Sequence, residues 1–402
     1  MGRIRTSPLG AGFVVAAVVC LAAAAVASVP TLLYVTGLLL GLVGAALVLV
    51  VLAPVRLAVA REFSPEEVAV GDEATVRLTF TRSSRLVPTS GTWSEILPRG
   101  VRGVARGDLP PLSRANPVAT AAYTVRPTRR GRPEVGPVVL EVTDPFDLVR
   151  RRVQVGGTDE MLVVPARVDL QQTSAGPHRR EEDSRWVSVR PGRGEDDVVA
   201  RPHRPGDSLA RTHWKATARR GSLMVRQEEE PSDVRSVVVL DVGAGAHAVQ
   251  RDADGVDELS DSLEWAVVAA ASILTELLRT GHGAELLTSD GRVRRTIGDG
   301  HDDVSDALVD LALVEPDRGR GLSVRLDQLP GGGPVLVLGD LDARSAADWL
   351  TLVPGPARAL VGAASERDAR RLLRDAGWHT VTYRPGDDLL EAWTRLVGSG
   401  AP

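Results

Sequence analysis

The segment RPHRPGDSLARTHWKATARRGSLMVRQEEE, residues 201–230, holds more turn-forming, basic and aromatic residues than its surroundings. A Pro-Gly-Asp turn opens it, two histidines and a tryptophan follow, and an acidic run closes it. Aromatic residues make up only 3% of the chain, so Trp214 indicates a stretch that is held in one shape. We expect Asp207 to cap a short helical turn over residues 208–215, with Trp214 as its buried anchor and a strand over residues 223–227.

The candidates for chemistry in this segment are His203, Asp207 and His213. Their spacing, His-x3-Asp-x5-His, matches no standard metal-ligand arrangement, so we favour a structural use. A metal-dependent hydrolase that uses these three residues is the alternative. The whole chain lacks a P-loop lysine motif, a Gly-x-Ser-x-Gly elbow and a His-Glu-x-x-His motif. The sequence therefore predicts no catalytic residue and no bound cofactor, and we expect a protein that is not an enzyme.

The amino-acid composition limits the class of protein and the number of domains. The chain has 402 residues, of which 43% are hydrophobic and 25% charged, so it is long enough for two or three domains with their own cores. The net charge of -4 gives no indication of a nucleic-acid partner. Arginine greatly outnumbers lysine, which is typical of a high-GC genome and indicates an actinobacterial type of source. Cys20 is the single cysteine, which excludes disulfides within the chain and a cysteine-based metal site.

An uncharged stretch near the N-terminus predicts a membrane hairpin over residues 1–54. Residues 11–29 and 31–53 are almost wholly apolar, and Pro30 separates them. About 20 residues are needed to cross the hydrocarbon core, so each segment is long enough for one transmembrane helix. A cleaved signal peptide is the competing interpretation of the first segment, but the second apolar run follows at once, without a polar cleavage region.

The charges that flank the hairpin predict its orientation. Arg3 and Arg5 precede the first apolar segment, Arg56 and Arg61 follow the second, and the turn between them is uncharged. Positively charged flanks stay on the cytoplasmic side. We therefore expect a multi-pass protein of the cell membrane with both termini and the soluble domains in the cytoplasm.

Residues 55–165 predict a β-sandwich-like domain. Residues 166–232 predict a polar connector that includes the segment at residues 201–230. Alternating or β-branched runs over residues 74–80, 119–125 and 138–142 are typical of strands. Asp144-Pro-Phe-Asp147 is interpreted as a turn between paired strands. The basic run at residues 129–137 is interpreted as a solvated edge, with contact to anionic lipid as the alternative.

Residues 233–399 predict an α/β domain with a mostly parallel sheet. Strands are expected at residues 236–240, 284–288, 334–338, 359–361 and 380–383, and helices at 257–280, 302–314, 343–352, 366–376 and 387–397. This alternation predicts a sheet covered on both faces, with any ligand beyond the carboxyl ends of its strands. Asp241 and Asp340 follow two of these strands.

The segment at residues 201–226 resembles the signature of the bacterial family called domain of unknown function 58. The matching runs are RPHRPGD, RTHWKATAR and LMVR, and Asp144-Pro-Phe-Asp147 resembles the upstream D-P-F-G motif of that family, with Asp147 in place of glycine. Two departures are His203 at a position where tyrosine is usual and His213 where an aliphatic residue is common. The signature residues, which we expect to form a partner-binding or domain-locking surface, are Gly206, Asp207, Arg211, Trp214, Ala218 and Arg219.

The resemblance implies a von Willebrand factor A-like C-terminal domain, in which a D-x-S-x-S sequence after the first strand helps to hold a divalent ion. Here the sequence is Asp241-Val-Gly-Ala-Gly245, so both hydroxyls are missing. We therefore expect Asp241 and Asp340 to form a degenerate metal-ion-dependent adhesion site that binds Mg²⁺ weakly or not at all. In the favoured interpretation Asp241 bonds within its own loop; Asp340 either offers a carboxylate or caps the helix that starts near Ala343.

The resemblance also implies a partner, because members of this family are commonly encoded beside MoxR-type AAA+ ATPases. We expect a membrane-anchored adaptor that acts with such an ATPase, and with other membrane or envelope proteins, in protein assembly or cell-envelope processes. A purely structural envelope component is a further alternative.

Overall fold

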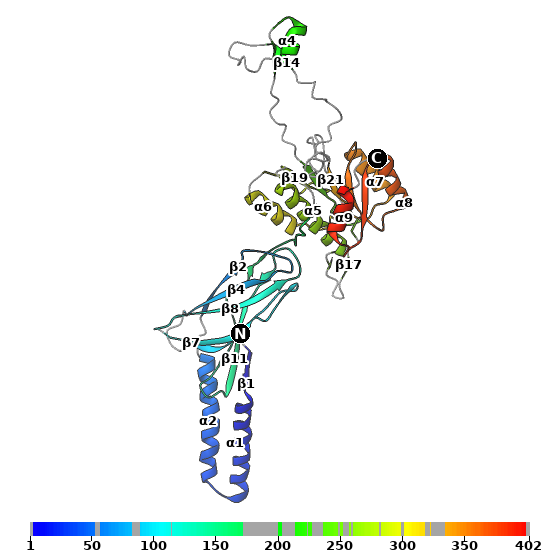
Figure 1. Ribbon diagram of the computed structural model, residues 1–402. Helices are drawn as coiled ribbons and strands as arrows, with labels where there is room; N and C mark the ends of the chain where they lie inside the picture. The colour runs from blue at the N-terminus through cyan, green and yellow to red at the C-terminus, as the bar shows by residue number, and fades with distance from the viewer. Residues whose placement is uncertain are drawn as a thin grey trace. The chain divides into compact units, whose positions relative to one another are not determined.

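The computed structural model describes residues 3–52, 57–82, 89–113, 115–171, 200–202, 214–222, 224–226, 236–247, 250–251, 257–258, 260–280, 283–298, 301–317, 322 and 334–398. The chain divides into two compact units, Met1–Ala166 and Arg167–Pro402. Figure 1 shows the elements of both.

The first unit begins with two long apolar helices that lie side by side (Figure 1). Helix α1 spans Pro8–Ala27 and helix α2 spans Thr31–Leu52, and both are long and apolar enough to cross a membrane. Thr36 of α2 donates its hydroxyl to the carbonyl oxygen of Ala17 at 3.4 Å, which is a polar contact between the two helices. The two apolar helices expected from the sequence are therefore present.

Strand-rich structure follows the helices, as expected. Its strands are β1 (Arg3–Thr6), β2 (Leu57–Ser64), β3 (Glu67–Ala69), β4 (Ala74–Arg82), β5 (Thr89–Glu95), β6 (Val101–Gly103), β7 (Arg106–Leu112), β8 (Val118–Pro127), β9 (Glu134–Val135), β10 (Val138–Thr143), β11 (Val149–Val155), β12 (Asp159–Glu160) and β13 (Leu162–Val164). Two larger sheets have the strand orders β1-β11-β10-β5-β7 and β2-β4-β8-β6, and β12–β9 and β13–β3 form separate pairs. Strand β1 adds residues from before the first helix to the sheet, which the sequence did not predict.

The two sheets share one apolar core. Strand β4 alternates buried and exposed residues, as a half-buried strand should. Its Phe80 meets Trp93 of β5 with ring centroids 6.1 Å apart, and Trp93 meets Tyr123 of β8 at 5.9 Å. Aromatic pairs at these separations contribute beyond the area that they bury.

A buried ion pair also joins the sheets of this unit. The side chains of Arg61 in β2 and Glu95 in β5 have no exposed surface, and the guanidinium Nε of Arg61 donates to Glu95. The Tyr123 hydroxyl donates to the other oxygen of Glu95, and Asp159 accepts from Nη1 of Arg61 at 2.7 Å. Burial raises the pKa of Tyr123 strongly, so the phenol stays protonated and donates to the carboxylate. Arg61, which the sequence suggested as a flanking charge, is thus used inside the β-domain.

The second unit is built on a mixed six-stranded sheet of order β20-β19-β16-β21-β22-β23. Its strands are β16 (Ser236–Leu240), β19 (Ala284–Thr288), β20 (Arg294–Ile297), β21 (Val335–Val337), β22 (Arg358–Gly362) and β23 (His379–Tyr383). Neighbouring strands are parallel except at the edge, where β20 runs antiparallel to β19. The sequence did not predict β20, because its run Arg-Arg-Thr-Ile is largely polar.

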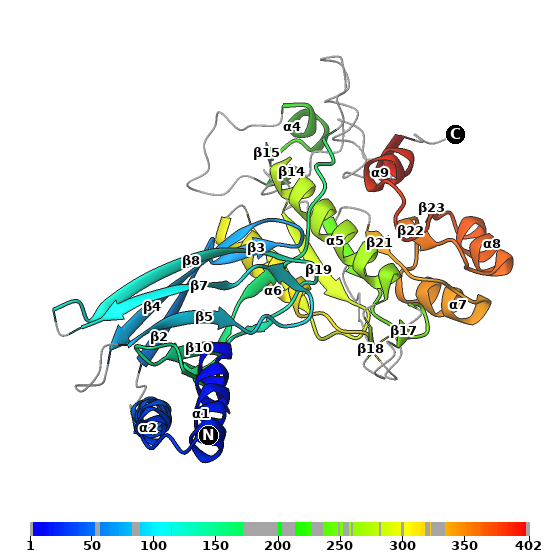
Figure 2. The same ribbon diagram turned by 90° about the horizontal axis from the view of Figure 1, so that it is seen from below.

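Helices cover both faces of this sheet. They are α5 (Asp261–Arg279), α6 (His301–Ala312), α7 (Ala343–Leu352), α8 (Arg367–Asp375) and α9 (Leu389–Gly398). Residues of α7 and α8, including Trp349 and Leu373, share a core with one face of the sheet. Helices α5 and α9 pack against the other face (Figure 2). The helix expected at residues 257–280 begins later, because Asp257–Glu258 pairs with Gln250–Arg251 as the short hairpin β17–β18.

Candidate functional site

An open cleft of ≈ 550 Å³ lies at the carboxyl ends of β16 and β21. Numbered along the chain, the sheet has the strand order 3-2-1-4-5-6, so its order reverses between β16 and β21. Ligands of open α/β sheets bind at this reversal, beyond the carboxyl ends of the strands. The cleft is therefore the candidate functional site of this unit.

All ionisable side chains in the described lining of the cleft are carboxylates. Those that line it are Asp241, Asp317, Asp340, Asp342, Asp348 and Glu366. No lysine or arginine is among the described lining residues, whose apolar part includes Leu322, Leu341 and Trp349. The two carboxylates that the sequence singled out, Asp241 and Asp340, thus line the same cleft.

Asp241 directly follows β16 and is only 3% exposed. Its Oδ1 accepts a hydrogen bond from the amide of Gly243 at 2.9 Å and another from the hydroxyl of Ser289 at 3.1 Å. The Ser289 hydroxyl in turn accepts from the amide of Val242 at 2.9 Å. Asp241 therefore holds the loop after its own strand and ties it to the end of β19, as the favoured interpretation expected.

Asp340 and Asp342 stabilise the neighbouring loops. Oδ1 of Asp340 accepts from the amide of Ala364, which follows β22, at 2.9 Å. Asp342 is the N-cap of α7 and accepts from the amide of Ser345 at 2.7 Å, which keeps the pKa of Asp342 below its ordinary value. The expectation that Asp340 caps this helix is wrong; the cap is two residues later, where the chain enters α7.

A buried histidine supports the base of the cleft. His247 has no exposed surface; its Nε2 lies 2.9 Å from the carbonyl oxygen of Asp241 and its Nδ1 lies 2.8 Å from the hydroxyl of Ser262. A carbonyl oxygen only accepts, so Nε2 carries the proton and Nδ1 accepts from Ser262. Burial lowers the pKa of His247, against the opposite effect of the Asp241 and Asp340 carboxylates. The ring is therefore a neutral structural link.

The sequence did not single out His247, Ser289, Asp317 or Glu366. Asp317 pairs with Gly243 in an isolated parallel bridge, and its amide donates to the carbonyl oxygen of Val242 at 2.7 Å. Glu366 accepts from the amide of Ala343 at 3.1 Å. None of these positions belongs to a short motif, and their proximity depends on the order of the strands.

The donor set does not fit the divalent ion that a von Willebrand factor A fold implies. Gly243 and Gly245 offer no side-chain oxygen, one carboxylate oxygen of Asp241 already accepts two hydrogen bonds, and Asp342 is engaged as a helix cap. Within the described ranges, no three His, Cys, Asp or Glu side chains converge as ligands. We derive no chemical step through a metal.

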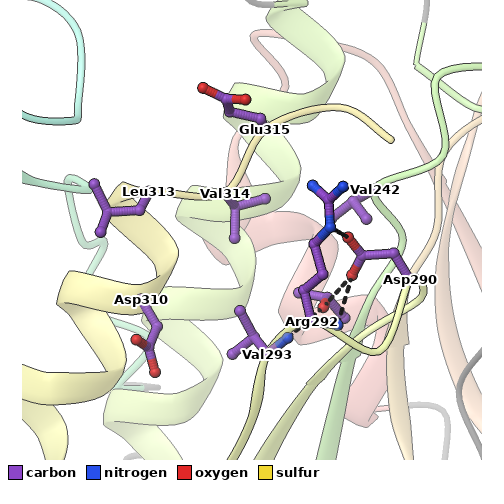
Figure 3. Close-up of a pocket in the computed structure, with 9 residues that line it drawn as sticks. Val242, Asp290, Arg292, Val293, Asp310, Leu313, Val314 and Glu315 are labelled. Carbon is purple, nitrogen blue, oxygen red and sulfur yellow. Dashed lines mark hydrogen bonds and ion pairs between the residues drawn. The ribbon is translucent and has the colours of Figure 1, made fainter. Parts of the chain in front are cut away.

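A smaller hollow of ≈ 150 Å³ lies between the β19–β20 turn and the end of α6 (Figure 3). Asp290 and Arg292 face each other there as an ion pair with a separation of 3.3 Å. Asp290 also accepts from the hydroxyl of Thr288 at 2.6 Å and from the amide of Arg292 at 3.1 Å. These contacts shape the turn and leave no set of groups arranged for chemistry.

The signature segment is described only in part. Helix α4 spans Trp214–Arg220 and β14 (Ala200–Pro202) pairs with β15 (Met224–Arg226). The amide of Met224 donates to the hydroxyl of Thr217 at 3.0 Å, which joins α4 to β15. Trp214 is the first residue of α4 and is 71% exposed, so the prediction of a buried anchor is wrong.

Other predictions fall outside the described residues. These are the roles of His203, Gly206, Asp207, Arg211 and His213, the helical turn at 208–215 before Trp214, and the polar connector beyond residue 171. Among the signature residues, Ala218 and Arg219 lie on α4 with Trp214, and all three are exposed.

The family model described as "Protein of unknown function DUF58" matches residues 199–352. Residues 199–352 belong to the DUF58 family. The matched region contains the signature segment, Asp241 and Asp340. The family resemblance expected from the sequence is thereby confirmed.

A curated protein similar to this chain is the "Uncharacterized protein YeaD" of Bacillus subtilis (strain 168). The two are 26% identical over 234 residues, which is 56% of this chain and 54% of the relative. The alignment thus spans about half the length of the relative. Among solved structures, the cohesin module from a Clostridium perfringens family 33 glycoside hydrolase matches 27% of this chain and 98% of its own, at 7% identity and a TM-score of 0.19.

Proposed function

We propose that this DUF58 protein is a membrane-anchored, non-catalytic adaptor whose α/β unit binds a partner protein. The observation that carries the proposal is the cleft at the carboxyl ends of β16 and β21, where the carboxylates of Asp241 and Asp340 accept hydrogen bonds from the backbone amides of neighbouring loops. The family resemblance implies a MoxR-type AAA+ ATPase as the partner.

The charge of the cleft favours a cationic ligand. Carboxylates that line a concave surface of low dielectric focus a negative potential, which attracts and orients positive groups. Leu322 in the lining of the cleft is only partly buried and can contact the aliphatic stem of an arginine or lysine. A basic segment of a partner protein therefore fits the cleft better than an anionic metabolite or a nucleic acid.

We also propose that the chain is anchored in the membrane with its soluble parts in the cytoplasm. Helices α1 and α2 would anchor the chain as a membrane-spanning hairpin with both termini and both soluble parts in the cytoplasm. The strand order with its reversal between β16 and β21 supports a von Willebrand factor A-like fold for the second unit. Such an arrangement keeps the cleft within reach of a cytoplasmic partner.

The test is affinity purification of the full chain from membranes, with nucleotide present, followed by identification of the proteins recovered. The variant D340N/D342N removes two charges from the cleft and keeps an acceptor oxygen at each position, and asparagine caps helices as well as aspartate does. Its matched control is D375N/D388N, which removes two exposed charges that do not line the cleft.

We expect the wild type and D375N/D388N to recover an AAA+ ATPase, and D340N/D342N to recover roughly tenfold less of it. Recovery of no such ATPase by the wild type, or equal loss in both variants, contradicts the proposal. A hydrolase turnover that is abolished by replacing His203 while folding is intact would favour the enzymatic alternative instead.

A further inference from the structure

The outer face of the strand pair β1–β11 carries a row of arginines. In the antiparallel register Arg5 lies opposite Arg150 and Arg3 lies opposite Arg152. Residues directly opposite each other in an antiparallel pair share a face, and positions two apart on one strand share it as well. Arg5, Arg150 and Arg152 therefore lie on one face of the sheet, and Arg5 and Arg150 form a pair of like charge across the two strands.

This face lies next to the start of the first apolar helix. Strand β1 ends at Thr6, Ser7 caps the helix, and α1 starts at Pro8, so Arg5 is three residues from the first helical position. Three residues span at most about 11 Å. The Debye length is about 8–10 Å at ordinary ionic strength, so charges at this distance are still felt at a bilayer surface. Figure 1 shows β1 and β11 at the same end of α1 and α2.

The acidic groups on this face only partly balance the arginines. Arg152 pairs with Glu141 at 2.7 Å, and Arg150 pairs with Asp147 at 3.0 Å and with Glu141 at 3.5 Å. Arg152 lowers the pKa of Glu141, and Arg150 lowers that of Asp147, so both carboxylates are ionised. With Arg5, the face holds more positive than negative charge, and like charges opposite each other across a strand pair are destabilising until an anion is bound.

An exposed aromatic ring lies on the adjoining turn. Phe146 is 54% exposed in the turn between β10 and β11. The carboxylate of Asp144 fixes this turn by accepting from the amides of Phe146 at 2.8 Å and Leu148 at 2.7 Å. The turn is in contact with the cap of α1, because the amide of Ser7 donates to the carbonyl oxygen of Leu148 at 3.0 Å. Phe146 therefore lies at the same level as the start of the helix.

We propose that Arg5, Arg150 and Arg152, with Phe146 beside them, form a surface that binds the headgroups of anionic phospholipids in the leaflet where α1 begins. The proposal rests on α1 and α2 spanning the membrane, which is part of the proposed function. Basic side chains attract the phosphates, and the ring enters the boundary between headgroups and acyl chains. The bound lipid relieves the repulsion between Arg5 and Arg150.

The test uses the full chain in nanodiscs of phosphatidylcholine alone or mixed with phosphatidylglycerol, and measures amide hydrogen exchange in β1 and β11. We expect exchange to be slower with phosphatidylglycerol, by about fivefold for each arginine that meets the lipid, and the difference to shrink at high salt. The variant R150Q/R152Q should lose most of the difference. R5Q is the second variant, which tests the edge strand if the double variant does not fold.

The matched control is R77Q/R126Q on the other sheet. Arg77 and Arg126 are exposed and also paired with carboxylates, Glu62 and Glu73, and neither lies on β1 or β11. This control should keep the full lipid effect. Equal exchange in the two lipid compositions, or equal loss in the control, overturns the proposal.

Two further outcomes test the lipid assignment and the membrane hairpin. If glycerol phosphate added to neutral nanodiscs reproduces the protection, the surface binds a soluble phosphate and the lipid assignment is wrong. If the chain does not enter neutral nanodiscs, the membrane hairpin itself is wrong and the proposal fails with it. No partner protein is present, so failure of the adaptor proposal at the cleft would leave this result unchanged.

Discussion

The backbone amide of Ser7 donates a hydrogen bond to the carbonyl oxygen of Leu148 at 3.0 Å. The Ser7 hydroxyl completes the link, because it donates to the carbonyl oxygen of Asp147 and accepts from the amide of Gly10 at 2.9 Å. One residue thus caps α1 and joins it to the β10–β11 turn. On the other helix, Arg151 donates to the carbonyl oxygens of Val50 and Val51 at the end of α2, at 3.1 and 3.3 Å. Both helices are therefore joined to the β-domain.

Gly10→Ala should destabilise this junction, because a Cβ atom at Gly10 would lie 2.1 Å from the carbonyl oxygen of Leu148. Backbone must shift to relieve such a contact, and overpacking of this kind costs about 1–3 kcal/mol. We expect a lower unfolding temperature in detergent and faster proteolysis between α1 and the β-domain. Gly12→Ala is the control, since a Cβ there meets nothing within 4 Å. Equal effects of the two variants would contradict the junction.

Asp147→Gly should leave stability close to that of the wild type, whereas Asp147→Val should lower it. Asp147 has a backbone φ of 53°, in the left-handed region that glycine adopts freely and β-branched residues adopt at a cost. We expect the valine variant to unfold roughly 2–4 °C lower than the glycine variant in a thermal scan. The comparison is between two variants that both lack the Arg150 ion pair, so identical unfolding temperatures would refute the backbone explanation.

Glu95→Gln should destabilise the β-domain by about 3–5 kcal/mol, because it leaves the buried Arg61 guanidinium without its closest counter-charge. Chemical unfolding followed by tryptophan fluorescence measures this, since Trp93 lies in the same core. Glu62→Gln breaks an exposed pair with Arg77 and should cost less than about 1 kcal/mol. A loss of similar size in both variants would mean that burial is not the cause.

The free energy of unfolding of the α/β unit should fall as the pH drops below about 6.5, the ordinary pKa of histidine. Burial lowers the pKa of His247, so in this range the unfolded chain takes up a proton that the folded chain does not. The contribution is complete above that pH and is lost below it. His247→Gln, whose amide still donates to the Asp241 carbonyl, should unfold with a weaker dependence on pH between about 7.5 and 5.5. An unchanged dependence would exclude His247 as a cause.

Local patterns in the sequence were sufficient for many elements. The apolar runs at residues 236–240 and 284–288 match β16 and β19, and the predicted helix at 343–352 matches α7. The two strand runs are short and mostly apolar, as strands buried on both faces are, and residues 343–352 have the length and apolar spacing of a helix. The turn predicted at Asp144–Asp147 also lies between two paired strands, β10 and β11.

Local patterns did not predict the features that depend on contacts between residues far apart in the sequence. Trp214 was expected to be buried because tryptophan is large and rare in this chain, yet burial depends on what packs against α4. Strand β1 was not predicted because its four residues become a strand only by pairing with β11, more than 140 residues away. His247 carries no motif, and only the fold brings it to the carbonyl of Asp241 and the hydroxyl of Ser262.

Sequence patterns are sufficient to predict the two apolar helices, the strand-rich region, most elements of the α/β unit and the family resemblance. Each of these depends on hydrophobic periodicity or on spacing between near neighbours, which the chain carries locally. Three relationships become visible only in the folded chain: Ser7 joins the turn at Leu148, carboxylates from separate loops line one cleft, and arginines of β1 and β11 share a face. Those relationships depend on strand order and register, which are set when distant segments pack and bury their apolar faces together.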